Sequence, residues 1–117
     1  MISQLKYYFK IILLENCPYS LNAKKLLDKY KIPCQQIIVS KKEKNKFKTE
    51  LISTFPQIYI KKNMNNGNLL IGGYDDLKYY FDIFRSKPLT KELFSSIYST
   101  NKFSKKGIII LYKLINI

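Results

Sequence analysis

A cysteine stands directly before an expected helix in the segment Cys17-Pro18-Tyr19-Ser20. The helix is predicted over residues 18–31, which repeat apolar side chains at helical spacing, and proline suits a first helical turn. A cysteine at a helix start meets the positive end of the helix dipole and free backbone N–H groups, and both favour the thiolate. Cys17 is therefore a candidate nucleophile, although a lone cysteine here is more often a small buried side chain at a strand end.

A second segment, Thr54-Phe55-Pro56, precedes an expected strand. An X-Pro bond at this position is a candidate for the cis isomer. The cis form would expose the backbone N–H and C=O of Phe55 for pairing with an extended peptide. Taken alone, a Thr-x-Pro turn is usually structural.

A third segment combines paired glycines with paired carboxylates, from Gly72-Gly73 to Asp75 and Asp76. The glycines allow a ligand to approach the backbone closely. The two aspartates stand at the start of the next expected helix, where they can cap the helix or hold an ammonium group. Both roles of the aspartates are open at this point.

The elements that must position these segments follow from the apolar pattern. We expect strands at 5–14, 34–39, 56–60 and 69–72, and helices at 18–31, 41–52, 75–86 and 90–98. The Asn65–Asn68 cluster is typical of a hairpin turn. A strand–helix–strand opening followed by a hairpin predicts a mixed sheet with helices on both faces. A polar connector at 99–107 leads to an apolar segment at 108–117, which is either an added strand or a docked helix.

In this order and spacing, the three segments together resemble the glutaredoxin family over roughly residues 5–98. The first matches the family's CPYC or CPYS active site, the second its Thr-Val-Pro segment and the third its GG-x-DDL segment. The resemblance implies an α/β, thioredoxin-like fold in which helices flank a mixed four-stranded sheet. We expect a glutaredoxin-like domain at 1–98 and a C-terminal extension at 99–117 of unknown role.

The resemblance also implies a thiol-disulfide oxidoreductase with glutathione as co-substrate, acting on glutathionylated proteins or small disulfides. The implied glutathione-binding residues are Tyr19, Thr54, Phe55, Pro56, Gly73, Asp75 and Asp76. By the same resemblance, Cys17 forms the mixed disulfide, the Phe55 backbone pairs with the tripeptide, and Asp76 holds the γ-glutamyl amine with help from Asp75. One of Lys44, Lys46 and Lys48 is expected to bind the glycine carboxylate, with no choice among them.

The chain departs from the family pattern at three places. Ser20 replaces the second active-site cysteine, and a hydroxyl cannot resolve a disulfide, so the resemblance implies a monothiol mechanism. Leu14, followed by Glu15, replaces a lysine that often stands three residues before the nucleophile, which removes a favourable charge. The hairpin at 61–71 looks longer than usual.

Two other functions compete with this one. Some monothiol relatives share a [2Fe–2S] cluster between two subunits through the cysteine and glutathione, but those typically carry glycine where this chain has Pro18. We expect no bound metal. A third hypothesis is an inactive interaction module that uses the basic surface and the apolar tail.

Topology argues against Cys34 as a resolving cysteine. The strands at 5–14 and 34–39 should be parallel because a right-handed helical crossover joins them. Cys17 then follows the end of the first strand, and Cys34 begins the second at the opposite edge of the sheet. Six strand residues separate the two edges by roughly 20 Å, whereas a disulfide needs Cα atoms within about 7 Å. We interpret Cys34 as structural.

Composition limits the remaining possibilities. The 117 residues fit one domain, and a hydrophobic content of 46% excludes a disordered chain. No apolar run approaches the roughly 20 residues of a membrane-spanning helix, and the N-terminus lacks a signal-peptide pattern. We therefore expect a cytoplasmic, reducing location. The absence of histidine excludes a His-ligated metal and a Cys-His pair.

The net charge of +13 suggests a nucleic-acid partner at first sight. However, the 21 basic residues are all lysines apart from Arg85. A protein dedicated to binding phosphate groups would favour arginine, because its planar guanidinium group matches the geometry of phosphate. A genome biased towards A/T-rich codons accounts for much of the lysine content. We do not expect nucleic acid to be the main partner.

Overall fold

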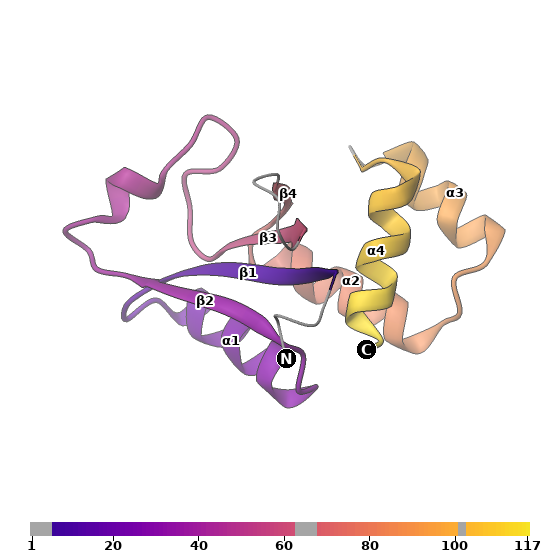
Figure 1. Ribbon diagram of the computed structural model, residues 1–117, viewed down its shortest axis with the longest axis horizontal. Helices are drawn as coiled ribbons and strands as arrows, with labels where there is room; N and C mark the ends of the chain where they lie inside the picture. The colour runs from indigo at the N-terminus through magenta and orange to yellow at the C-terminus, as the bar shows by residue number, and fades with distance from the viewer. Residues whose placement is uncertain (1–5, 63–67, 101–102) are drawn as a thin grey trace.

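The computed structural model describes residues 6–62, 68–100 and 103–117 (Figure 1). Its strands are β1 (Tyr7–Leu14), β2 (Cys34–Val39), β3 (Gln57–Lys62) and β4 (Asn68–Gly72). Its helices are α1 (Pro18–Lys29), α2 (Tyr74–Ser86), α3 (Lys91–Thr100) and α4 (Lys105–Ile115), with a short 3₁₀ helix at Lys44–Phe47. Most of the predicted elements are therefore present, with bounds shifted by a few residues.

The strands form one sheet in the order β2-β1-β3-β4. β1 runs parallel to β2 and antiparallel to β3, and β3 pairs with β4 in an antiparallel hairpin. The predicted mixed four-stranded sheet flanked by helices is thus confirmed. The Asn65–Asn68 turn signal falls mostly outside the described residues, which resume at Asn68.

The helix predicted over residues 41–52 is wrong, since only the 3₁₀ helix at Lys44–Phe47 forms there. Lysines four residues apart would face one another on an α-helix, and like charges at this spacing destabilise it. Thr49 also competes for the backbone, because its hydroxyl accepts the N–H groups of Leu51 and Ile52 at 3.2 and 3.1 Å. Leu51, which a helix over this segment would place on its apolar face, is 82% exposed.

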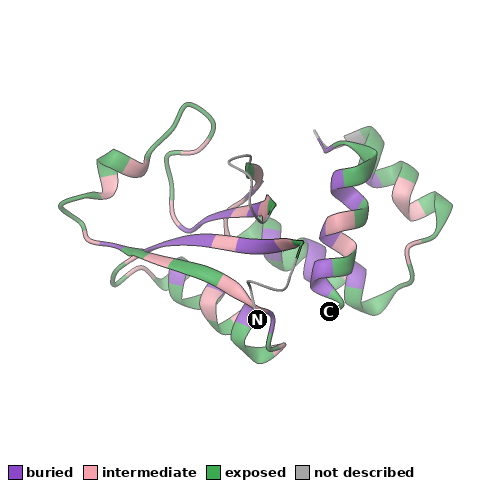
Figure 2. Cartoon of the chain, viewed as in Figure 1, coloured by how far each residue is buried: buried purple, intermediate pink, exposed green. Residues whose placement is uncertain are grey.

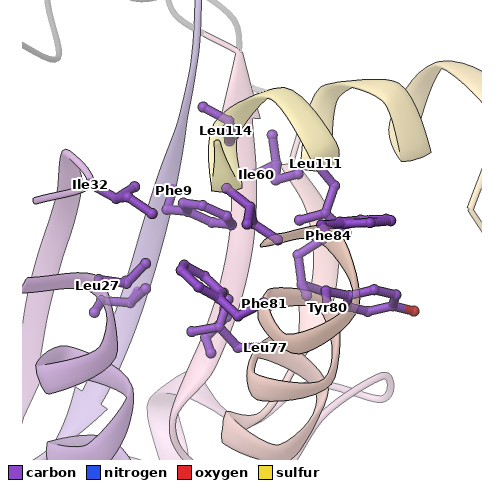
Figure 3. Close-up of a cluster of buried hydrophobic side chains, with 14 of the residues drawn as sticks. Phe9, Leu27, Ile32, Ile60, Leu77, Tyr80, Phe81, Phe84, Leu111 and Leu114 are labelled. Carbon is purple, nitrogen blue, oxygen red and sulfur yellow. The ribbon is translucent and has the colours of Figure 1, made fainter. Parts of the chain in front are cut away.

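The core lies between the sheet and the helices, and the buried residues are concentrated on β1 and β3 and on the inward faces of the helices (Figure 2). Its members include Phe9, Ile11, Leu27, Ile58, Ile60, Leu77, Phe81, Phe84, Ile108 and Leu111. These side chains come from β1, β3, α1, α2 and α4, and Figure 3 shows Leu111 beside Phe84 and Ile60. The apolar tail is therefore a docked helix rather than an added strand.

Polar contacts fix α4 in place. The Ser104 hydroxyl accepts the N–H of Gly107 at 3.0 Å and caps the helix start. At the other end, the Arg85 guanidinium donates to the carbonyl of Ile115 at 2.9 Å, and the Asn116 amide donates to the carbonyl of Phe84 at 3.2 Å.

Among the helices in the described residues, none is both long and apolar enough to cross a membrane.

Candidate functional site

Cys17 occupies the N-cap position of α1, in extended backbone conformation with φ −104° and ψ 119°. Its carbonyl accepts the N–H of Leu21 at 3.0 Å, which closes the first helical turn. Pro18 follows in that turn, where its missing N–H costs nothing. The thiol is free and half-buried, so it faces the positive end of the helix dipole while staying accessible.

The Phe55–Pro56 peptide bond is cis, as the sequence suggested. The Phe55 carbonyl accepts a weak hydrogen bond from the thiol of Cys17, with 3.9 Å between Sγ and oxygen. Two segments 38 positions apart in the chain therefore meet at the thiol. Pro56 itself is buried and does not face the solvent.

A groove of about 540 Å³ extends from this contact between the loop that precedes β3 and the start of α2. Six of the predicted binding residues line it, namely Tyr19, Thr54, Phe55, Gly73, Asp75 and Asp76. Cys17 is not among the described lining residues of this groove, but its thiol contacts Phe55, which is one of them. The groove therefore combines the half-buried Phe55, which contacts the thiol, with the two exposed carboxylates of Asp75 and Asp76.

Asp76 has a structural role as well as a place in the groove. Its carboxylate accepts the N–H of Gly73 at 2.9 Å and so caps the start of α2. Gly72 makes this contact possible, because a Cβ there would overlap the Asp76 carboxylate and its φ of +132° is one that other residues rarely adopt. The paired glycines predict close approach by a ligand, but residue type and spacing do not indicate that Gly72 makes room for Asp76.

Ser20, at the position of the family's second cysteine, is buried and points towards β1. Its hydroxyl accepts the N–H of Leu14 at 3.0 Å. This bond ties the first turn of α1 to the end of the strand. The side chain thus has a structural partner, which residue type and spacing alone did not reveal.

The lysines proposed for the glycine carboxylate are not brought into the groove. Lys44, Lys46 and Lys48 lie in or beside the 3₁₀ helix, and the described lining of the groove contains none of them. Lys46 instead forms an exposed ion pair with Glu43, at 3.8 Å.

Cys34 lies far from Cys17. It pairs with Phe9 on β1, whereas Val39 pairs with Leu14 at the strand end nearest the thiol. Five residues of strand, or roughly 17 Å, separate Cys34 from that end. Burial raises the pKa of the Cys34 thiol, although a hydrogen bond from Gln36 at 3.5 Å opposes this change. The parallel pairing predicted from topology is confirmed.

Comparisons with known proteins converge on one family. The family model described as glutaredoxin matches residues 5–64, which include Cys17 and the Thr54-Phe55-Pro56 segment. Glutaredoxin 1 of Rickettsia prowazekii is 43% identical over 72 residues, which cover 57% of this chain and 70% of that protein. The crystal structure of glutaredoxin 1 from Francisella tularensis complexed with cacodylate is similar, with a TM-score of 0.55 and 28% identity over 69% of this chain and 99% of that one.

Proposed function

The chain belongs to the glutaredoxin family of thiol-disulfide oxidoreductases, and from this premise we propose that it is a monothiol enzyme that reduces glutathione mixed disulfides through Cys17. One observation carries the proposal. The Cys17 sulfur stands at the start of α1, 3.9 Å from the carbonyl of Phe55, and Phe55 lines a groove that also holds Asp75 and Asp76.

The proposed reaction has two exchanges. The Cys17 thiolate attacks the glutathione sulfur of the substrate's mixed disulfide, a new S–S bond forms between Cys17 and glutathione, and the substrate leaves as a thiolate that takes up a proton. The thiolate of a second glutathione then attacks the bound glutathione sulfur. Oxidised glutathione leaves and Cys17 is again a thiolate. Both steps need only one enzyme thiol.

Glutathione recognition follows from the chemistry of the groove. We propose that the backbone of Phe55, beside the thiol, forms hydrogen bonds with an extended peptide as an added strand would. Asp75 and Asp76 offer negative charge to the γ-glutamyl ammonium, and a charge-assisted hydrogen bond there would be about twice as strong as a neutral one. Tyr19 borders the groove beside the thiol. These contacts together favour the tripeptide over an unrelated thiol.

The proposed monothiol mechanism rests on two side chains. Ser20 cannot form a disulfide, and its hydroxyl is bonded to the Leu14 N–H. Cys34 pairs with Phe9, too far from Cys17 to bridge to it. Nothing in the described residues favours the iron–sulfur alternative, so we do not propose it.

The direct test is a coupled assay with the mixed disulfide of glutathione and mercaptoethanol. Glutathione, glutathione reductase and NADPH regenerate the system, and NADPH oxidation reports turnover. We expect turnover that requires both the protein and free glutathione. Turnover that continued when thioredoxin and its reductase replaced glutathione would contradict glutathione dependence.

Asp76→Asn is expected to raise the KM for the glutathionylated substrate by about tenfold, because a charge-assisted hydrogen bond contributes roughly 1.5–3 kcal/mol. The asparagine oxygen can still accept the Gly73 N–H, so Tm should change little. Asp82→Asn is the matched control, since it removes the same charge from the exposed side of α2, where Asp82 pairs with Lys78 at 2.9 Å. If the KM of Asp76→Asn equals that of the parent, Asp76 caps α2 and does not bind the substrate.

A further inference from the structure

A second cavity lies between the start of β1 and α4, two elements that Figure 1 shows side by side. Its volume is about 640 Å³, within the roughly 300–1,000 Å³ of small-molecule sites. Apolar side chains from the end of the chain line it, namely Ile109, Ile110, Leu114 and Ile117. Ile109 is 40% exposed and Ile117 is 59% exposed, so the apolar surface is open to a ligand.

Positive charge surrounds this apolar surface. Lys6, Lys106 and Lys113 line the cavity, and no aspartate or glutamate is among its described lining residues. Burial tends to raise the pKa of Tyr7, but hydrogen bonding and charge from Lys106, with further charge from Lys6 and Lys62, lower it overall. Lys6 and Lys106 therefore bring positive charge close to Tyr7 at the border of the cavity.

We propose that this groove, formed by Lys6 and Tyr7 of the β1 end and by α4, binds a single-chain anionic amphiphile such as a long-chain carboxylate. The chain would cover Ile109 and Ile117, and the head group would meet the ammonium groups of Lys106 and Lys113. Lysine suits this arrangement because its methylene stem lies along apolar surface while its charge stays in water. Nothing in the redox reaction requires this site.

Other occupants fit less well. A second copy of the chain would bring another net charge of +13 to a lysine-lined surface, which opposes association. A flat anionic membrane would need a broad apolar face, but α4 turns Ile108, Leu111 and Ile115 into the core. A concave cavity with an apolar floor and a cationic rim instead matches one chain with one charged head.

The test is isothermal titration calorimetry of the full chain with monomeric laurate, below the concentration at which laurate forms micelles. We expect saturable binding of one laurate per chain and no binding of methyl laurate, which lacks the charge. Lys106→Glu should weaken laurate binding by about tenfold through loss of a charge-assisted contact. Lys105→Glu is the matched control, because it makes the same charge change one residue away, outside the lining, and should bind laurate like the parent.

A second variant, Ile109→Ser, removes apolar surface without changing charge and should also weaken laurate binding. Absence of saturable binding, equal binding of methyl laurate, or equal weakening by Lys105→Glu and Lys106→Glu would overturn the proposal. Binding to phosphatidylglycerol vesicles but not to monomeric laurate would overturn it in favour of a membrane surface. A dimer that forms without laurate and is lost in Ile109→Ser would overturn it in favour of a second copy.

Discussion

Cys17→Ser is expected to abolish the reduction of glutathione mixed disulfides, leaving only uncatalysed exchange, whereas Cys34→Ser keeps most of the activity. A serine hydroxyl at the N-cap of α1 would preserve the helix start but not supply a thiolate. Cys34 sits opposite Phe9 on β1, remote from the Phe55 carbonyl that the Cys17 sulfur contacts. The coupled glutathione assay measures both variants against the parent chain.

Alkylation provides an independent control for this pair. Iodoacetamide reacts with thiolates, and burial raises the pKa of the Cys34 thiol. At neutral pH, peptide mapping should therefore find label at Cys17 before Cys34, and labelling of Cys34 should rise as the pH increases. Equal loss of activity in Cys17→Ser and Cys34→Ser would contradict the assignment of Cys17 as the sole nucleophile.

Leu111→Ala is expected to lower the free energy of unfolding by about 2–5 kcal/mol, the usual cost of truncating a fully buried leucine. Leu111 is fully buried in the core cluster and packs beside Ile60 and Phe84 (Figure 3). Small domains are stable by only about 5–15 kcal/mol, so this single change would remove a large part of that stability. Urea denaturation, followed by circular dichroism, measures it.

Ile117→Ala is the control, because it truncates an apolar side chain of the same C-terminal segment that lies beyond α4 and is largely exposed. Its free energy of unfolding should stay close to that of the parent. A parent-like stability in Leu111→Ala would mean that the C-terminal segment folds independently of the sheet. The predicted large loss instead requires α4 to be part of the same cooperative core.

The sequence predicted the sheet well because its strands carry strong local signals. Residues 7–14 are rich in aromatic and β-branched side chains, which favour a buried strand. Helix α1 begins at Pro18, and β3 begins directly after Pro56. The fixed φ of proline limits the backbone conformations that are available at both places. The thiol's position at a helix start and the cis bond before β3 followed from the same local features.

Features that depend on distant partners were not predictable. The segment at 41–52 has an apolar spacing compatible with a helix. However, the Thr49 hydroxyl accepts the N–H of Leu51, and the Leu51 side chain is exposed rather than packed against another element. The apolar pattern of the tail fits a strand as well as a helix. The helix α4 is favoured because it packs against Phe84 and Ile60, which are distant in the sequence. The bond from Ser20 to the Leu14 N–H links two elements, and residue spacing carries no sign of it.

Mass spectrometry after treatment with oxidised glutathione tests the monothiol mechanism most directly. The parent chain should gain one glutathione, mapped to Cys17, while Cys34 remains a free thiol. Ser20→Cys is the matched variant, since its new thiol stands one helical turn from Cys17, within bridging reach. That variant should mostly lose two hydrogens as it forms an intramolecular disulfide. If the parent itself lost two hydrogens without an adduct, Cys34 would have reached Cys17 and the single-thiol account would be contradicted.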